Sequence, residues 1–423
     1  MRWREYPVLP DGDDRFEEFR AGLDDDAARV LAYLVGRRES DEVDVEEATR
    51  LAVRVGTGLG RDATIEALST LETIGLVTST TVERDTRGRP PKGWKAVADR
   101  EMLSRQVRSH HSYRLLERAA DVASHFGATL PTEWLADVDS TAAVPDDTTS
   151  LTVALNWLPN GLHAPLIAAT DFGSYEDHGV TVSLEAARGS GSAIDRLRAG
   201  GVDIAVVGAA SFCRAADESL VPLALLHQRS LAVLYTTTEQ LGEPFASVEQ
   251  MRGRRLAVTP DSEVSLLARL FLAQSNVLDD VETVAVAGDE QEALEDGDAA
   301  VATGMPIDAH ELSTAGHDVS SLSVADHFPV PGPALVTTVS TLREEPAAVR
   351  QFLMGTIAGA TAARNRLEQT AQRVTDRSGN DVASERWRIE HARDWAAAER
   401  GWGWQTLDAW ERLEIALRTE ATG

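Results

Sequence analysis

The sequence predicts a multidomain protein in which an α+β region precedes a larger α/β domain. Within residues 1–100, three short helical patterns are followed by two β-like stretches. From Leu151 onward, short apolar strands alternate with helical segments, which is typical of a mainly parallel sheet covered by helices. After residue 342 the pattern is helical to the end. We therefore expect four segments, at 1–100, 101–149, 150–342 and 343–423.

The N-terminal elements follow from apolar spacing and from capping residues. The pattern predicts helices around residues 27–34, 45–53 and 65–71 and strands at 76–82 and 94–97. The first helix follows an acidic cap at Asp24. The third helix turns Ile65 inward and ends before Gly75, because glycine suits the left-handed position after a helix.

The charge balance is strongly acidic, because 41 basic residues against 68 acidic ones give a net charge of −27. Lys92 and Lys95 are the only lysines, and the other basic residues are arginines. Such a composition suits a cytoplasm at molar salt, where the Debye length is about 3 Å and like-charge repulsion is screened. We expect a cytoplasmic protein of a halophile and not a generally basic nucleic-acid coat.

Other features exclude further classes of protein. Cys213 is the only cysteine, so no disulfide framework is expected. The first residues lack the apolar segment of a secretory signal, and no long apolar run predicts a membrane span or a membrane partner. His110 and His111 are adjacent and point to different sides of a helix, so we expect no metal site.

A basic segment interrupts the acidic chain at residues 84–95. It holds five positive charges and one negative charge, and both lysines lie in it. Three helices followed by a ribbon with a basic tip resemble the winged helix-turn-helix regulators of prokaryotes. The resemblance implies binding of a double-stranded DNA operator by the ribbon and the third helix. The candidate DNA-binding residues are Arg61, Thr64, Arg84, Arg87, Arg89, Lys92 and Lys95.

Other interpretations of this region stay open. The ribbon could be a solvated basic hairpin, or the winged fold could bind protein. Asp62, Glu66 and Glu72 would repel phosphate if they faced DNA, and counterion release is weak at molar salt. The longer helix predicted at 101–126 serves either dimerisation and signal relay or plain packing between modules. We expect a homodimer, because operators are usually read as two half-sites.

Two motifs near the start of the α/β domain carry a more specific resemblance. The first strand leads into Asn156-Trp157-Leu-Pro-Asn-Gly-Leu-His163, and Phe172-Gly-Ser-Tyr-Glu-Asp-His-Gly-Val follows the next helix. These motifs resemble the periplasmic-binding-fold proteins for thiamine pyrimidine precursors, the pyrimidine synthases of the same fold, and their sulfonate-, nitrate- and taurine-binding relatives. The resemblance extends over about 150–365 and implies a C-terminal α/β domain of type II, periplasmic-binding-protein-like, with two lobes. Residues 150–342 then form the ligand-binding domain.

Ligands of open α/β sheets bind beyond the carboxyl ends of the strands. A tryptophan at such an end can stack on a flat heterocycle, and a glycine- and serine-rich helix start offers backbone N–H groups. The resemblance also implies a carboxylate in the second lobe that accepts hydrogen bonds from an aminopyrimidine; Asp261 and Glu263 are both candidates. The alternative role of these two carboxylates is to cap the helix N-terminus, that of Trp157 is core packing, and that of His163 is a place at the start of a helix. The candidate ligand-binding residues are Asn156, Trp157, His163, Gly191, Ser192, Ser211, Phe212, Thr259, Asp261, Ser262 and Glu263.

The resemblance does not extend to catalysis. The synthase relatives hold pyridoxal phosphate on a lysine and use a nearby histidine, and by register these positions are Gly208 and Phe212 here. Their cysteine-rich run for iron corresponds to residues 330–338, which contain no cysteine. We therefore expect no enzyme and no cofactor. A pyrimidine- or pyridoxal-handling enzyme with an accessory winged domain is one alternative.

The function we expect is a ligand-responsive transcription regulator that senses a thiamine-related pyrimidine such as hydroxymethylpyrimidine. A second alternative keeps the architecture but senses a sulfonate, nitrate or other small anion, with Arg188 as the cationic residue. The helices of 343–423 should pack on the ligand-binding domain. Five of the nine tryptophans lie there and favour packing against the second lobe over a lid or a dimer face, namely Trp387, Trp395, Trp402, Trp404 and Trp410.

Overall fold

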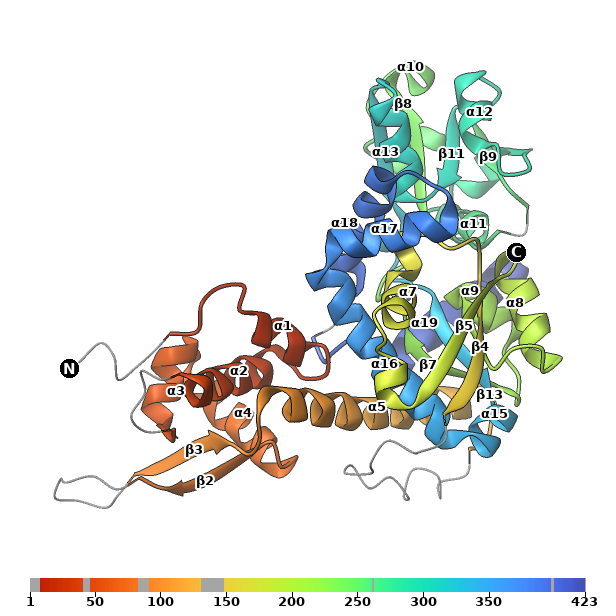
Figure 1. The fold of residues 1–423 in the computed structure, drawn as a ribbon. Coiled ribbons are helices and arrows are strands. Elements are labelled where there is room, and N and C mark those ends of the chain that lie inside the picture. The colour runs from red at the N-terminus through yellow and green to blue at the C-terminus, as the bar shows by residue number, and fades with distance from the viewer. Residues whose placement is uncertain are drawn as a thin grey trace.

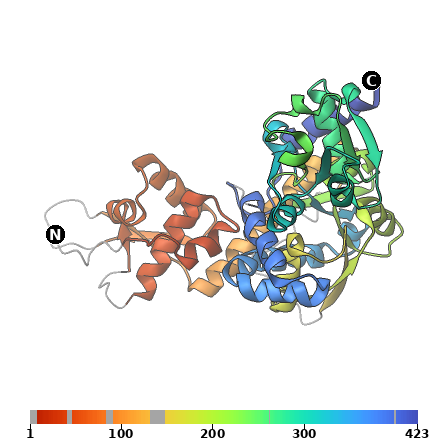
Figure 2. The same cartoon turned by 90° about the horizontal axis from the view of Figure 1, so that it is seen from above.

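A small N-terminal region is joined by one long helix to a larger domain in which two lobes lie one above the other (Figure 1). Seen from above, the N-terminal region stands to one side of the lobes (Figure 2). The structure is a computed structural model and describes residues 8–40, 46–82, 91–130, 148–260, 262–396 and 399–422. No helix in these ranges combines the length and the apolar character needed to cross a membrane.

The N-terminal region is α+β with a small antiparallel sheet. Its elements are α1 (Asp14–Arg20), α2 (Asp25–Glu39), β1 (Ala48–Thr49), α3 (Arg50–Thr57), α4 (Arg61–Thr73), β2 (Val77–Thr81) and β3 (Lys92–Ala96). β3 pairs with both other strands, which gives the sheet order β1-β3-β2. The Asp24 side chain accepts a hydrogen bond from the Ala27 backbone N–H, so the predicted acidic cap of α2 is confirmed.

Two details of this region differ from the sequence prediction. α3 begins at Arg50 and not at residue 45, because the Thr49 side chain caps it. The inward position of Ile65 is wrong, since its side chain is 37% exposed, whereas the neighbouring Thr64 is fully buried. The inward face of α4 therefore runs through Thr64, Leu68 and Leu71 at helical spacing.

The predicted long helix is confirmed as α5 (Arg100–His125). Its buried side chains enter three hydrophobic cores in turn. Leu103 belongs to the N-terminal core, Leu115 to the core of the first lobe, and Val122 to a core that both lobes share. α5 is thus part of the packing of both regions and not a tether between them.

The first lobe surrounds a sheet of order β5-β4-β6-β13-β7. β4 pairs in parallel with β5 and β6, whereas β13 runs antiparallel between β6 and β7. The elements are β4 (Thr149–Leu155), η2 (Gly161–His163), α7 (Ala164–Asp171), η3 (Glu176–His178), β5 (Val180–Ala186), α8 (Gly189–Arg198), β6 (Ile204–Val207), α9 (Ala209–Ala215), β7 (Leu220–Leu225), β13 (Ala334–Thr338) and α15 (Val339–Glu344).

The second lobe surrounds a sheet of order β10-β9-β11-β8-β12. β9 pairs in parallel with β10 and β11, and β8 is antiparallel to both of its neighbours. The elements are β8 (Val233–Thr237), α10 (Thr238–Leu241), η4 (Val248–Met251), β9 (Arg255–Val258), α11 (Glu263–Gln274), η5 (Leu278–Asp280), β10 (Glu282–Ala285), α12 (Glu290–Glu295), β11 (Val301–Gly304), α13 (Pro306–Thr314), β12 (Val319–Ser323) and α14 (Val324–His327).

The chain crosses between the lobes twice, at 226–232 and at 328–333. The two crossing segments are hydrogen-bonded to each other: the Leu226 N–H donates to the Pro333 carbonyl (2.7 Å) and the Ser230 N–H to the Val330 carbonyl (2.8 Å). As predicted, both sheets are mainly parallel: four of the five strands in each run in one direction, and the reversed strand is β13 in the first lobe and β8 in the second. The sequence prediction omits β12 and β13, because β12 is rich in serine and the short β13 directly follows a Pro-Gly-Pro turn.

The C-terminal helices pack on both lobes. They are α16 (Pro346–Asn365), α17 (Leu367–Ser378), α18 (Val382–Ala396) and α19 (Leu407–Thr422). Trp387 stacks on His310 of the second lobe, with ring centroids 4.4 Å apart, as predicted. The same prediction is wrong for Trp402 and Trp404, which lie in the core of the first lobe. Trp410 is fully buried in the shared core, and the side chain of Trp395 lies outside the described part of the chain.

Candidate ligand site between the two lobes

The candidate site begins where β4 ends and the chain turns into η2. The Nε2 atom of His163 donates a hydrogen bond to the Asn156 Oδ1 atom at 3.0 Å, and the imidazole is buried. Trp157 lies between them in the chain, with 57% of its surface exposed. The structure thus brings the three predicted residues together, with an open indole beside a buried polar pair.

A second histidine, which the sequence analysis missed, comes from the first crossing segment. His227 is 1% exposed, and its Nε2 atom donates to the Leu162 carbonyl of η2 at 2.9 Å. No local motif surrounds His227, because its place near His163 depends on where the chain leaves β7. Only its position at the end of an apolar strand could have indicated it.

Both histidines are neutral at pH 7. Burial, together with the nearby His227, lowers the pKa of His163 to about 3. Burial also lowers the pKa of His227, to about 4. A neutral imidazole that donates from Nε2 keeps a lone pair on Nδ1. Neither Nδ1 atom has a hydrogen-bond partner among the described residues, so two buried acceptors lack donors.

Glu263, the first residue of α11, joins the second lobe to the first. Its carboxylate accepts hydrogen bonds from the Ala210 N–H (2.8 Å) and from the Ser211 N–H (2.9 Å) at the start of α9. Burial raises the pKa of Glu263, while the hydrogen bonds from Ser211 and Ala210 oppose that shift. A Cβ atom at Gly208 would lie 2.4 Å from the carboxyl carbon of Glu263, so this contact requires glycine there.

The predicted positions around α9 fall into two groups. Ser211 donates its hydroxyl hydrogen to Glu263 at 2.5 Å, so it lies at the contact between the lobes. Phe212 is fully buried against Phe126 and Trp410, and its predicted contact with ligand is wrong. Successive helical residues differ by about 100°, so the residue after Ser211 points into the core.

The remaining predicted residues have mainly structural partners. Gly191 is exposed and Ser192 half-buried in the first turn of α8. The Thr259 hydroxyl accepts a hydrogen bond from the Gly288 N–H at 2.9 Å. Ser262 caps α11, as the structural alternative predicted, by accepting from the Ser265 N–H at 3.1 Å. Asp261 lies outside the described residues.

α18 connects the two lobes beside the candidate site. The buried Glu385 carboxylate accepts a hydrogen bond from the Gly161 N–H of the first lobe at 2.5 Å. On the second lobe, Arg388 pairs with Glu311 at 3.3 Å and Trp387 stacks on His310. Figure 1 shows α18 between α13 and α7. A relative movement of the lobes would therefore break contacts of α18.

The predicted DNA-binding residues of the N-terminal region are only partly described. Arg61 is exposed at the start of α4. The prediction for Thr64 is wrong, because its buried hydroxyl donates to the Gly60 carbonyl at 2.7 Å. Lys92 pairs with Glu72 at 3.1 Å, and Lys95 lies 3.4 Å from Glu47 and 3.6 Å from Glu46. The positions that lie outside the described residues are Arg84, Arg87 and Arg89.

The described part of the chain contains no group of three or more His, Cys, Asp or Glu side chains arranged to hold a metal ion. Cys213 is half-buried on α9, and burial raises the pKa of its thiol. The site therefore offers hydrogen-bond acceptors, an exposed indole and a carboxylate that joins the lobes, which is the chemistry of recognition by hydrogen bonding and stacking.

Comparison with known proteins assigns the larger domain. Residues 160–369 match the family described as "NMT1/THI5 like". No curated protein matches the chain.

Three solved structures share the fold at low sequence identity. A Candida albicans gene product, described as having the generic periplasmic binding protein fold, is 14% identical with a TM-score of 0.52, and the match covers 65% of this chain and 90% of that one. The aliphatic sulphonate binding protein of Escherichia coli is 16% identical with a TM-score of 0.50, over 58% and 84% of the two chains. The ligand-binding component of an ABC-type import system from Staphylococcus aureus is 14% identical with a TM-score of 0.50, over 65% and 93%.

The N-terminal region lies outside the matched residues and has no assigned family. The C-terminal part of the chain therefore has the type II periplasmic-binding-protein fold, and residues 160–369 within it are similar to the NMT1/THI5-like family.

Proposed function

We propose that the protein is a cytoplasmic, ligand-responsive transcription regulator that senses a thiamine-related pyrimidine. The observation that carries the proposal is the pair of buried, neutral histidines, each with an Nδ1 acceptor that has no donor among the described residues. A buried acceptor without a partner costs free energy, so the site is completed by a ligand that donates hydrogen bonds. The amino group of an aminopyrimidine is such a donor.

The same chemistry favours a pyrimidine over a small anion. The oxygens of a sulfonate or nitrate accept hydrogen bonds and would face two further acceptors. Arg188, the cation that an anion site would use, is exposed on the surface. The exposed Trp157 indole supplies an aromatic face on which a flat heterocycle can stack.

We further propose binding without turnover. The synthases that the sequence resembles hold their cofactor on a lysine at the position of Gly208. Here the Glu263 carboxylate occupies the space that a side chain at Gly208 would need. A lysine at this position would have to displace the contact between the lobes.

The proposed DNA-binding part rests on the order of the N-terminal elements. The helices α2, α3 and α4, the short strand β1 and the ribbon of β2 and β3, in the sheet order β1-β3-β2, have the arrangement of a winged helix, which α1 precedes. Arg50, Arg54 and Arg61 are exposed on α3 and at the start of α4. They would contact phosphate or base edges, while Asp62 and Glu66 limit non-specific attraction.

α5 would couple ligand binding to DNA binding in a homodimer. A ligand that favours one arrangement of the lobes shifts the population of that arrangement, and α5 passes the change to the N-terminal region. Coupling free energies of this kind are typically about 1–3 kcal/mol.

The ligand proposal is tested by titrating the full chain with hydroxymethylpyrimidine in molar KCl while tryptophan fluorescence is recorded. We expect saturable binding at micromolar concentration, and at least a tenfold loss of affinity in His163→Phe and in His227→Phe. His317→Phe, at an exposed position of the second lobe, is the matched control. Absence of binding, or equal affinity in all three variants, would reject the pyrimidine.

The DNA proposal has its own test. The full chain is used to select from a pool of random double-stranded oligonucleotides, with and without hydroxymethylpyrimidine. We expect enrichment of a two-fold symmetric sequence, with loss of that enrichment in Arg61→Ala. A pool that stays random would reject DNA binding and leave the ligand proposal untouched.

A further inference from the structure

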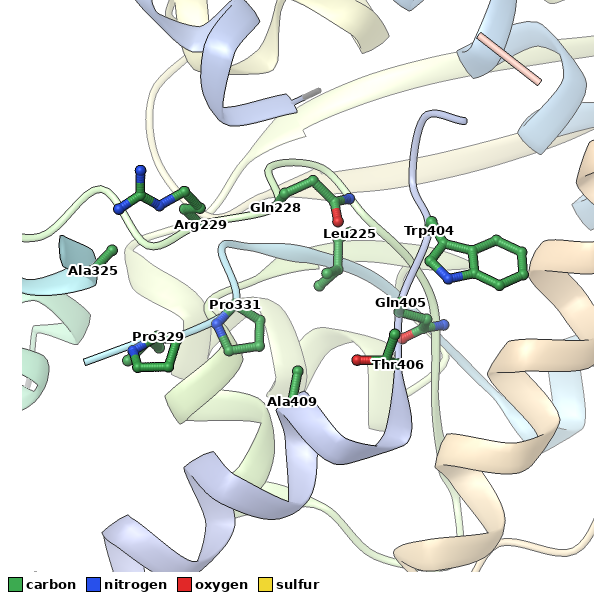
Figure 3. A pocket seen from close by; sticks show the side chains of 11 residues that line it. Leu225, Gln228, Arg229, Ala325, Pro329, Pro331, Trp404, Gln405, Thr406 and Ala409 are labelled. Carbon is green, nitrogen blue, oxygen red and sulfur yellow. The ribbon is translucent and has the colours of Figure 1, made fainter. Parts of the chain in front are cut away.

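A cavity lies where the two crossing segments meet the start of α19. Its volume is about 240 Å³. A water molecule in the liquid takes about 30 Å³, so the cavity has room for several waters or for one small organic molecule. Figure 3 shows Gln228 above Leu225, Trp404 to one side, and Pro331 and Ala409 below.

Four parts of the chain supply most of the walls, to which Leu225 of β7 and Ala325 of α14 are added. The first crossing supplies Gln228, the second supplies Pro331, the segment before α19 supplies Trp404, and the first turn of α19 supplies Ala409. Both crossing segments change direction when the lobes move relative to each other. The shape of the cavity is therefore tied to the arrangement of the lobes.

The chemistry of the walls selects a ligand class. Most of the surface is apolar and includes the rings of Pro329, Pro331 and Trp404. Arg229, the charged residue among those that line the cavity, is paired with Asp326, so the wall offers no net charge. The Gln228 Nε2 atom is buried and has no acceptor among the described residues. A flat neutral molecule with one hydrogen-bond acceptor complements this surface.

We propose that this cavity is a second small-molecule site, which takes a neutral aromatic or heteroaromatic compound with a carbonyl or ring-nitrogen acceptor. The acceptor meets the Gln228 amide, and the ring lies between the proline rings and Trp404. Neither His163 nor His227 lines this cavity, although Gln228 directly follows His227 in the chain, so the proposal does not rest on the histidine pair.

The position of Trp404 suggests what occupancy does. The guanidinium groups of Arg114 on α5 and of Arg400 lie over the Trp404 ring, at 4.5 Å and 5.6 Å from its centroid. The next residue, Gln405, donates to the Pro222 carbonyl of β7 at 2.7 Å. Only the Trp404 side chain therefore separates a ligand in this cavity from Arg114 of α5, the helix that enters the N-terminal core.

The test uses benzamide, a flat neutral molecule with a carbonyl acceptor, and saturation-transfer NMR on the full chain in molar KCl. We expect transfer from the protein to the benzamide ring at millimolar concentration. Ala409→Phe fills the cavity and should abolish the transfer, and Gln228→Leu should weaken binding about fivefold because it removes the donor. Ile415→Phe, an exposed position on the same helix, should leave binding unchanged.

Three results would overturn the proposal: no transfer to benzamide, transfer that persists in Ala409→Phe, or loss of transfer in Trp157→Ala, which would place benzamide in the candidate ligand site instead. If Ala409→Phe does not fold, the benzamide affinity of Gln228→Leu decides whether benzamide binds in this cavity. If hydroxymethylpyrimidine displaces benzamide from the wild-type chain but not from His163→Phe, the two sites respond to each other. If it displaces benzamide from both chains, the two molecules compete for one site.

Discussion

The N-terminal region and the interlobe site treat their polar side chains in opposite ways. The two lysines of the ribbon, which sequence reasoning assigned to DNA, are paired with glutamates of their own region. The two histidines between the lobes are buried, and each keeps one nitrogen without a partner. The difference teaches that a charge that is prominent in a sequence can be neutralised within its own region, whereas a buried polar atom without a partner stays available for a ligand.

The largest effect is expected where the two lobes meet. Glu263→Ala leaves the Ala210 and Ser211 N–H groups without their acceptor and should lower the free energy of unfolding by about 2–4 kcal/mol. Urea unfolding in molar KCl measures the change. Glu292→Ala, at an exposed position of the same lobe, should change it by less than about 0.5 kcal/mol. Equal effects of the two variants would mean that the contact between the lobes is not stabilising.

The next largest effect on the unfolding free energy is expected at the junction between the N-terminal region and the larger domain. Gly401 has a φ of +96°, and a Cβ atom there would lie 2.7 Å from the His111 ring. Gly401→Ala should therefore cost about 1–3 kcal/mol of unfolding free energy. Gly379→Ala is a matched control, because Gly379 also has a positive φ of +78° but open space around its Cβ position. If both variants lose the same free energy, backbone strain alone explains the loss.

Acid should destabilise the protein through its buried histidines. The folded pKa values of His163 and His227, about 3 and about 4, lie below the unfolded value of 6.5. The unfolded state then binds more protons between pH 6.5 and about pH 4, so stability falls as pH falls, by about 1.4 kcal/mol per pH unit for each histidine.

The share of one histidine can be isolated. His227→Gln should reduce the loss of unfolding free energy between pH 6.5 and pH 5.5 by about 1 kcal/mol. The exposed His317→Gln should leave the loss unchanged. An unaltered pH dependence in His227→Gln would mean that His227 is accessible to protons in the folded state.

The smallest effect tests the paired lysine. Glu72→Gln removes the partner of Lys92 and should change the unfolding free energy by less than about 1 kcal/mol, because the pair is exposed. Under the proposed function, DNA affinity should rise a few-fold, measured by fluorescence anisotropy on the selected duplex. Glu66→Gln removes the same charge from α4 without releasing a lysine. An equal rise of DNA affinity in both variants would mean that the affinity depends on net charge alone and not on the release of Lys92.

Sequence reasoning succeeded where the determinants are local. The cap at Asp24, the long helix α5 and the trio of Asn156, Trp157 and His163 each follow from residues close together in the chain. It failed where the chain returns from a distance. His227 depends on the first crossing and the antiparallel β13 on the second, and neither has a local signature.

The error at Phe212 has a different cause. The apolar run of residues 202–210 has the pattern of a single strand, whereas β6 ends at Val207 and α9 begins at Ala209. In a strand, Ser211 and Phe212 would occupy opposite faces, one of which meets the ligand. In the helix, Ser211 meets Glu263 and Phe212 meets Trp410. A shift of three residues in an element boundary thus turned a core residue into a predicted contact.

The entry of α5 into three cores fixes the rotation of one region against the other. One residue inserted near its middle would turn the N-terminal region by about 100° and displace it by about 1.5 Å. Seven inserted residues would return it to within about 20° of its original orientation, at a distance about 10 Å greater. Exchange of either region with another protein would therefore succeed only at lengths of α5 that preserve the helical phase.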